Sequence, residues 1–194
     1  MANTPTLTKA MLADMMKGNA SISLLACPAN GEVTFTNLDF DTADQIFTTK
    51  DSFQIVSSDA TISNFQIDQF DEIVDSSFEE GDYTINANIP SMASAILDYF
   101  YTAGATVSQM KGQDGTTTYD GKGYSDRKEL YCSILVESAS KKTAVCFARV
   151  RVTVNPPSRD NNTDPAYLKF VGTILANLKA GQGNFAVLKK HTTT

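Results

Sequence analysis

The chain has 194 residues, of which 42% are hydrophobic and 20% charged, and its formal net charge is -6. A chain of this size buries roughly 70% of its unfolded surface, so it needs neither disulfides nor a metal for stability. The negative charge argues against general nucleic-acid binding, which rests on clustered lysine and arginine. No stretch approaches the roughly 20 apolar residues of a membrane-spanning helix, and residues 1–18 lack the features of a signal peptide. We therefore expect one domain, residues 1–194, made in a cytoplasm and without a membrane partner.

The charges are unevenly distributed along the chain. Between Asp39 and Asp82 there are twelve acidic residues and a single basic one, Lys50. Between Lys111 and Thr194 there are thirteen basic and seven acidic residues. One subunit therefore has an acidic half and a basic half, which would attract each other between copies of the chain.

Residues 1–19 are predicted to form an N-terminal helical arm. Apolar residues recur there at spacings of three and four, as on one face of a helix: Leu7, Met11, Leu12 and Met15. After this arm the periodicity changes to two. The runs Ser21–Ala26 and Glu32–Asn37 flank the turn residues 28–31, which predicts a β-hairpin.

Residues 39–82 are the least regular region of the sequence. Their apolar residues are loosely spaced and interrupted by acids. A long irregular segment of this kind is often a functional loop or arm. We predict an acidic arm at residues 39–82 that faces solvent or a neighbouring subunit.

A clearly alternating strand is predicted at Tyr83–Ile89. A helix is predicted over residues 91–103, with Ser91 as its N-cap and Gly104 as its stop. Its apolar stripe consists of Met92, Ile96, Leu97 and Phe100. Residues 107–124 are rich in glycine and polar side chains, which predicts a hairpin or loop.

Three strong strands follow, at Leu130–Glu137, Ala144–Val154 and Ala166–Leu178. A shorter apolar run at 185–188 is predicted to pair with a sheet edge. The predicted fold class is mainly β. It is an antiparallel β-sandwich or barrel with one flanking α-helix (91–103) and an N-terminal helical arm.

The sequence offers little for catalysis. Its only histidine, His191, lies in a polar C-terminal tail, where a catalytic base is not held rigidly. The acids around Asp71 and Glu72 leave a glycosidase-type carboxylate pair open, but a solvated acidic face explains their clustering better. The acids and amides of residues 160–164 miss the spacing of a calcium loop.

Cysteine usage predicts no metal site either. Three cysteines occur, without CxxC or Cys–His spacing. Cys132 and Cys146 alternate with apolar strand residues and are expected in the core. We therefore predict no catalytic, cofactor-binding or metal-binding residue.

The strongest signal is for assembly. The two strands between residues 130 and 154 have apolar residues on the second face as well: Tyr131, Leu135, Val145 and Phe147. Strands that are apolar on both faces are covered on both faces, by a helix, an arm or another subunit. Together with the charge asymmetry, this favours head-to-tail contacts that close rings or grow filaments. The alternative is that the charge asymmetry is accidental and the helix covers the second face.

The order of elements from residue 81 onward is a strand within Gly81–Pro90, a helix at Ser91–Ala103, a β-meander at 130–154 and a late strand at 166–178. In this order, which covers about half of the chain, the sequence resembles the tail tube proteins of long-tailed, lambda-like phages. These proteins share a fold with the inner tubes of contractile tails and of type VI secretion. The acidic region 53–80 resembles the variable arm by which such subunits stack on the next ring.

The resemblance implies a six-fold ring stacked into a hollow tube, with an acidic lumen through which viral DNA passes without specific binding. Its partners would be copies of itself and other phage tail proteins, without a cofactor. It would be located in the virion tail after assembly in the cytoplasm of a bacterial host. The alternatives left open are a capsid decoration or tail-completion protein and a monomeric β-sandwich binding module.

Overall fold

β-Strands make up most of the chain in the computed structural model. It describes residues 19–49, 51–59, 61–67, 70–79, 81–159 and 166–190, with backbone alone at residues 19–21 and in β4 and β5. The first elements are β1 (Asn19–Ala26), the short 3-10 helix η1 (Phe35–Asn37), β2 (Asp44–Ile46), β3 (Gln54–Ser57), β4 (Thr61–Ile67), β5 (Phe70–Glu79) and β6 (Tyr83–Ile89). They are followed by α2 (Ser94–Phe100), β7 (Tyr101–Lys111), β8 (Thr118–Arg127), β9 (Leu130–Ser138), β10 (Thr143–Val154), β11 (Leu168–Ile174) and β12 (Phe185–Lys189).

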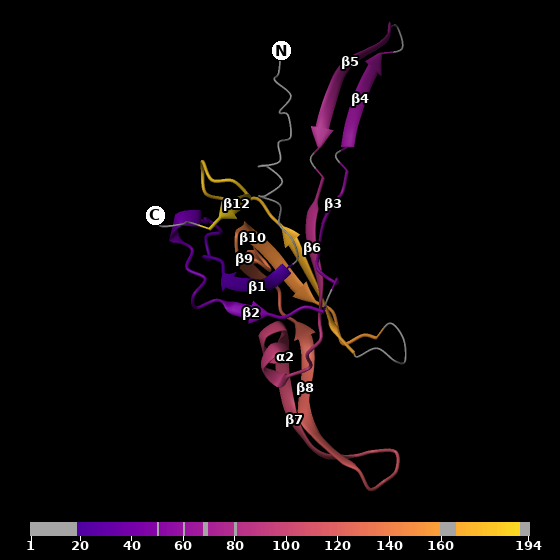
Figure 1. Cartoon of the computed structure of the whole chain (residues 1–194). Helices are drawn as coiled ribbons and strands as arrows, with labels where there is room; N and C mark the ends of the chain where they lie inside the picture. The colour runs from indigo at the N-terminus through magenta and orange to yellow at the C-terminus, as the bar shows by residue number, and fades with distance from the viewer. Residues whose placement is uncertain are drawn as a thin grey trace.

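Eight strands form one antiparallel sheet and four form two separate hairpins. The sheet has the order β2-β1-β9-β10-β11-β6-β3, and β12 pairs with β10 beside this path. The hairpins β4–β5 and β7–β8 pair only with themselves and project from opposite ends of the core (Figure 1). The mainly β, antiparallel fold class with one flanking helix is therefore confirmed. Of the predicted N-terminal arm, only Asn19 lies within the described residues, and there it begins β1.

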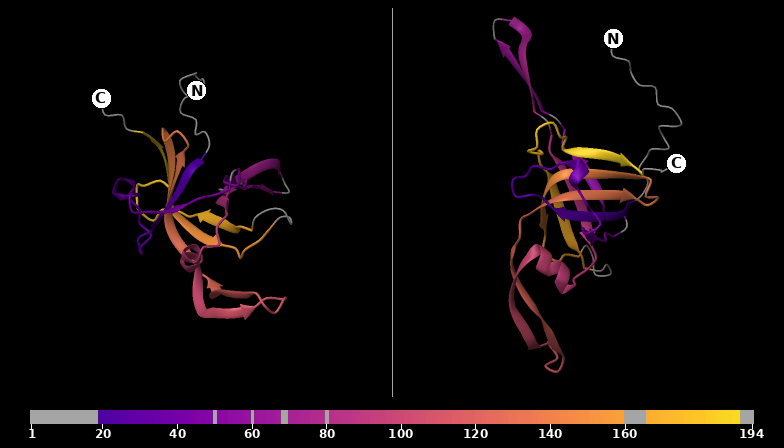
Figure 2. Two further views of the ribbon diagram at one scale, coloured as in Figure 1. Left: turned by 60° about the horizontal axis from the view of Figure 1, so that its bottom comes forward. Right: turned by 90° about the vertical axis from the view of Figure 1, so that its left-hand side faces the viewer.

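The sheet folds over itself because β10 changes partner halfway along its length. Its first half, up to Phe147, pairs with β12, and its second half, from Val150, pairs with β11. Between the two halves a β-bulge sets Ala148 and Arg149 opposite the single residue Ser133 of β9. A bulge bends its strand and increases the local twist. The result is two layers joined through β10 (Figure 2). One contains β2, β1 and β9, with β12 on the other side of the first half of β10, and the second contains β11, β6 and β3.

The backbone groups that the bulge removes from the ladder have found other partners. The Ala148 N–H donates to the carbonyl oxygen of Asn184 at 2.9 Å, and the Arg149 carbonyl accepts from the Leu175 N–H at 2.9 Å. The buried Ser133 hydroxyl donates to the Ala148 carbonyl at 2.6 Å. An unpaired buried backbone group is costly, so these three bonds stabilise the bend.

The core lies between the two layers and continues beneath α2. Its fully buried side chains come from both layers and from the helix: Ile22, Leu24, Ile85, Ile89, Phe100, Ile134, Val136, Val150, Val152, Leu168 and Phe170. The alternation predicted for β6 and β9 is confirmed by their burial. The prediction for β10 is wrong before the bulge, because Val145 and Phe147 pair with Val136 and Ile134 and pack with the core instead of lying on the second face. Cys132 and Cys146 are buried, as predicted.

The predicted hairpin of residues 21–37 is wrong in its second strand. The turn forms, with the Gly31 N–H donating to the Pro28 carbonyl at 2.8 Å, but the chain does not return along β1. The side-chain amide of Asn177 instead bonds both backbone groups of Val33, at 3.0 and 2.8 Å. β1 pairs with β2 and β9.

The helix is shorter than the predicted 91–103. It begins at Ser94, with Ala93 and not the predicted Ser91 at the N-cap position, and it ends at Phe100. Tyr101 then begins β7 with extended backbone angles. The Tyr101 hydroxyl donates to the Val154 carbonyl at 2.8 Å inside the core, and residues 101–103 pair with β8. Pairing between distant segments thus overrides local helix propensity, and Gly104 is a strand residue.

The acidic region 39–82 is more regular than predicted, because it contains β2, β3 and the β4–β5 hairpin. Residues 107–124, predicted as a hairpin or a loop, form the outer part of the β7–β8 hairpin, so the hairpin alternative is confirmed. The late strand is shorter than the predicted 166–178, since β11 ends at Ile174. The run predicted at 185–188 forms β12 and pairs with β10.

The hydrogen bond from the Ser133 hydroxyl to the Ala148 carbonyl leads to a prediction about the free energy of unfolding. Ser133→Ala removes the hydroxyl that donates to the Ala148 carbonyl, and leaving a buried acceptor unpaired costs about 1–3 kcal/mol. Urea unfolding followed by circular dichroism measures this change. Ser108→Ala in β7, an exposed strand position, is the control and should change stability by less than about 0.5 kcal/mol. Equal stability of the two variants would show that the Ser133 hydroxyl does not support the bend.

Candidate interaction surfaces

The β7–β8 hairpin is fastened to the core at its base. The Lys122 ammonium donates to the Asp98 carboxylate of α2 at 2.8 Å, and Lys128 donates to the Asp98 carbonyl oxygen at 2.7 Å. The hydrogen bond from Lys122 lowers the pKa of the Asp98 carboxyl. On the other side, Arg127 donates to the side chain of Asn155 at 2.7 Å. The base of the hairpin is therefore held on both sides, whereas its outer part extends beyond the core (Figure 1).

The tip of this hairpin has an ordered turn. The Asp114 carboxylate accepts the backbone N–H groups of Thr116 and Thr117 at 3.0 and 2.8 Å, and the Thr117 hydroxyl at 2.6 Å. These bonds, the one from the Thr117 side chain first, lower the pKa of the Asp114 carboxyl to about 2. Gly115 supplies the left-handed backbone that the turn requires, with a φ of 70°.

An apolar pair lies beside that turn. Met110 and Tyr119 are direct partners across the hairpin, and their side chains are 57% and 54% exposed. Large apolar side chains at the end of a projecting hairpin are typical anchors of a protein–protein contact. The sequence pattern did not single them out, because their strands were predicted only as a hairpin or loop.

The β4–β5 hairpin extends β3 and β6 away from the core at the opposite end. Its base is closed where the Ser58 N–H donates to the Asp82 carbonyl at 2.9 Å and the Asp82 N–H donates to the Ser58 hydroxyl at 2.7 Å. Gly81 is required here, because a Cβ atom would lie 2.1 Å from the Ser58 carbonyl oxygen. The predicted acidic arm is thus a two-stranded projection. Asp71 and Glu72 belong to β5, whose side chains are outside the described part of the structure.

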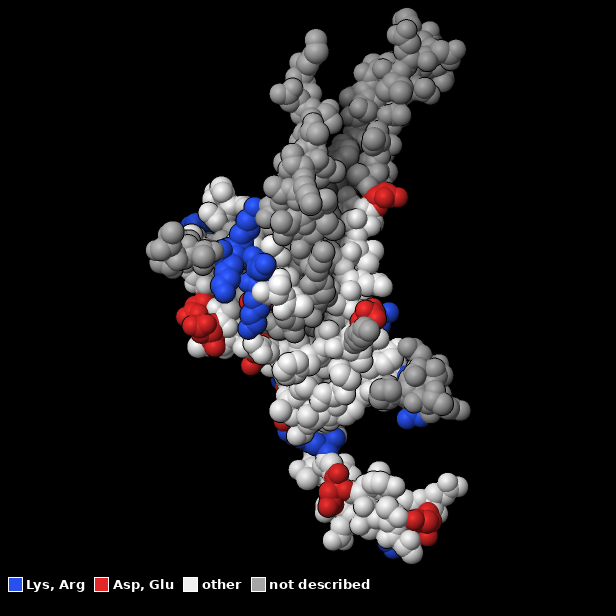
Figure 3. Space-filling view, viewed as in Figure 1, with Lys and Arg blue, Asp and Glu red and all other residues white. Residues whose placement is uncertain are grey.

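Basic side chains gather at the end of the β9–β10 turn and of β12. The Lys190 N–H donates to the Lys142 carbonyl at 2.9 Å, which brings the two segments together. The resulting basic cluster consists of Lys141, Lys142, Lys189 and Lys190, and Figure 3 shows lysine and arginine gathered on this face of the core. It belongs to the basic half identified in the sequence.

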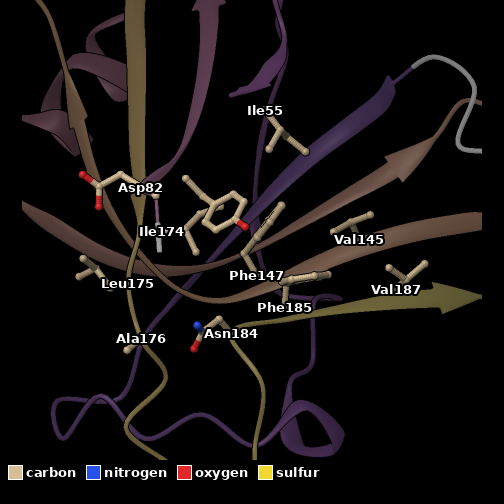
Figure 4. A pocket seen from close by; sticks show the side chains of 12 residues that line it. Ile55, Asp82, Val145, Phe147, Ile174, Leu175, Ala176, Asn184, Phe185 and Val187 are labelled. Atoms are coloured by element: carbon tan, nitrogen blue, oxygen red, sulfur yellow. The ribbon is translucent and has the colours of Figure 1, made fainter. Parts of the chain in front are cut away.

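An apolar groove opens at the seam where β12 of one layer faces β3 and β6 of the other. It has a volume of about 450 Å³. Its apolar lining comes from both layers: Ile55, Tyr83, Val145, Phe147, Ile174, Phe185 and Val187. Figure 4 shows these side chains around a common opening, and Asp82 and Asn184 add polar side chains to its lining. The sequence feature that points to this groove is the run at 185–188. It is apolar at successive positions, so the strand has apolar side chains on both faces.

Several residues considered for chemistry cannot be placed. His191 and residues 160–164 lie outside the described residues. Among the described residues, no group of three or more histidine, cysteine, aspartate or glutamate side chains could hold a metal ion. No helix in the same part of the chain is long and apolar enough to cross a membrane.

No protein-family model matches this chain, and a search of curated proteins finds no match. Its function is therefore inferred from its sequence pattern and the geometry of four features: the two hairpins, the basic cluster and the apolar groove.

The cysteines provide a test of burial. Burial raises the pKa of Cys132 to about 11 and that of Cys146 to about 12, so neither forms an appreciable thiolate at pH 8. Cys27 is half-buried and its pKa is also raised. We expect a thiol reagent at pH 8 to modify at most one cysteine per chain in the native protein and three after denaturation in urea. Rapid modification of two or three in the native state would contradict the packing of β9 and β10.

Proposed function

We propose that this chain is a structural subunit that assembles with copies of itself into stacked rings, forming a hollow tube of the kind found in phage tails. The observation that carries the proposal is the pair of hairpins that project from opposite ends of a folded core (Figures 1 and 2). Neither hairpin pairs with the central sheet. Contacts made in opposite directions by one subunit generate open stacks of subunits.

The hairpins themselves favour a partner. An isolated two-stranded hairpin is marginally stable in water and needs further strands or a packing surface. The β7–β8 hairpin has its described contacts with α2 and the core near its base, and its tip exposes Met110 and Tyr119. A neighbouring subunit would supply the surface that this tip lacks.

The charge distribution supports a head-to-tail arrangement. The acidic run is concentrated between Asp59 and Asp82, in and around the β4–β5 hairpin. The basic cluster at the end of β12 lies on the core (Figure 3). Opposite charges on different parts of one subunit attract between copies and speed their association. In a tube built this way, six copies per ring and a DNA conduit are what the family resemblance implies.

Removing one hairpin tests the proposal without cutting into the core. Deletion of residues 60–80 joins Asp59 directly to Gly81, so that β3 and β6 are connected by a two-residue Asp-Gly turn. Asp-Gly is a favoured two-residue hairpin turn, and it follows the Ser58–Asp82 pair that already closes the strands. We expect the deletion variant to fold and to sediment as a monomer.

Sedimentation velocity over a wide concentration range is the measurement. The full chain should form species much larger than 21.0 kDa as its concentration rises, and the Δ60–80 variant should not. The control is the double substitution Thr106→Ser with Thr116→Ser, which preserves both hairpins and should assemble like the full chain. A full chain that remains a monomer at every concentration would contradict the proposal and favour a monomeric binding module.

A further inference from the structure

The apolar groove between β12 and β3 is an uncovered part of the core. Val145 and Phe147 on its floor belong to the same strand face as buried core residues. Its walls are open, with Ile55 43% exposed, Phe185 56% and Val187 65%. An engineered apolar cavity of about 150 Å³ holds a benzene ring, so a groove of about 450 Å³ has room for roughly three apolar side chains. Contiguous apolar surface of this kind normally has an occupant.

The sequence before β1 contains a segment of matching chemistry. Residues 5–17 have an apolar stripe at helical spacing, made of Leu7, Met11, Leu12 and Met15. The opposite side of the same helical pattern has Lys9, Ala13 and Lys17. Such a segment presents one apolar face to a groove and one polar face to water.

The point where this segment joins β1 is close enough to the groove for the segment to reach it. β1 begins at Asn19, which pairs with Ser138 at the β9–β10 turn. On the far side of that turn, Thr143 pairs with Lys189 at the end of β12. Adjacent strands are about 4.8 Å apart, so β1 and β12 are separated by roughly 14 Å at this end of the sheet. A 13-residue helix is about 20 Å long and spans this distance without disturbing β1.

We propose that residues 5–17 seat their apolar stripe in the groove between β12 and β3 of the same chain. The tether favours the chain's own segment over a second copy, because a short connection gives an effective concentration in the millimolar range. Seated there, the segment covers the seam between the two layers and buries the exposed faces of Phe185 and Val187. This inference holds whether or not the subunit forms a tube.

The absence of tryptophan from the chain makes a single-tryptophan reporter unambiguous. Met11→Trp places the reporter on the apolar stripe, and Ala13→Trp places it on the opposite side as the matched control. At concentrations where sedimentation shows only monomer, the Met11→Trp variant should have a blue-shifted emission maximum and be protected from acrylamide quenching. The Ala13→Trp variant should have the emission and quenching of a water-exposed tryptophan. Leu7→Trp is a second stripe reporter, in case Met11→Trp fails to fold.

A second pair of variants tests whether the groove is the site to which the segment binds. Val187 lines the groove, whereas its neighbour Leu188 lies on the other face of β12, near the basic cluster. In the Met11→Trp background, Val187→Asp should abolish the blue shift and Leu188→Asp should leave it unchanged. If the tryptophan of the Met11→Trp variant is exposed to water although the groove residues are unchanged, the proposal is overturned. A blue shift that appears only as concentration rises would also overturn it, because the occupant would then be a second copy.

Discussion

The whole fold depends on the bend of β10 at Ala148 and Arg149. Because two residues of β10 lie opposite one residue of β9, the strand turns out of the first layer and can pair with β12 before the bend and β11 after it. Phe147 before the bend and Val150 after it then lie in the same core. The Ser133 hydroxyl and the backbone of Asn184 and Leu175 satisfy the polar groups that the bend would otherwise leave unpaired. Without this bend the eight strands would form a single open layer with no enclosed core.

The bend also determines where the interaction surfaces lie. Once the two layers face each other, β12 and β3 meet at a seam that no described strand bridges, and the groove forms there. The two hairpins are continuations of core strands, since β3 and β6 continue into β4 and β5, and β8 is followed closely by β9.

The sequence alone predicts the strands whose own pattern of apolar and polar residues indicates which face is buried. β6 alternates along its whole length, and its bounds match the prediction. The bounds of β10 are predicted to within a residue, but its bulge is not, because residues 144–148 are all apolar and do not alternate. Prediction from the sequence fails where contact with a distant segment determines the local structure. Val33 is held by the side chain of Asn177, and residues 101–103 are extended because β8 pairs with them. The groove and the Met110–Tyr119 pair depend on which strands become neighbours, and that information is not local in the sequence.

Self-assembly through the projecting hairpins is the central claim, and electron microscopy of the concentrated full chain tests it most directly. The account predicts stacked rings or tubes with a central hole, in which the β4–β5 hairpin reaches from one ring to the next. The symmetry of the rings would be counted in the same images. Monomers or single closed oligomers at every concentration, with no stacking, would contradict it.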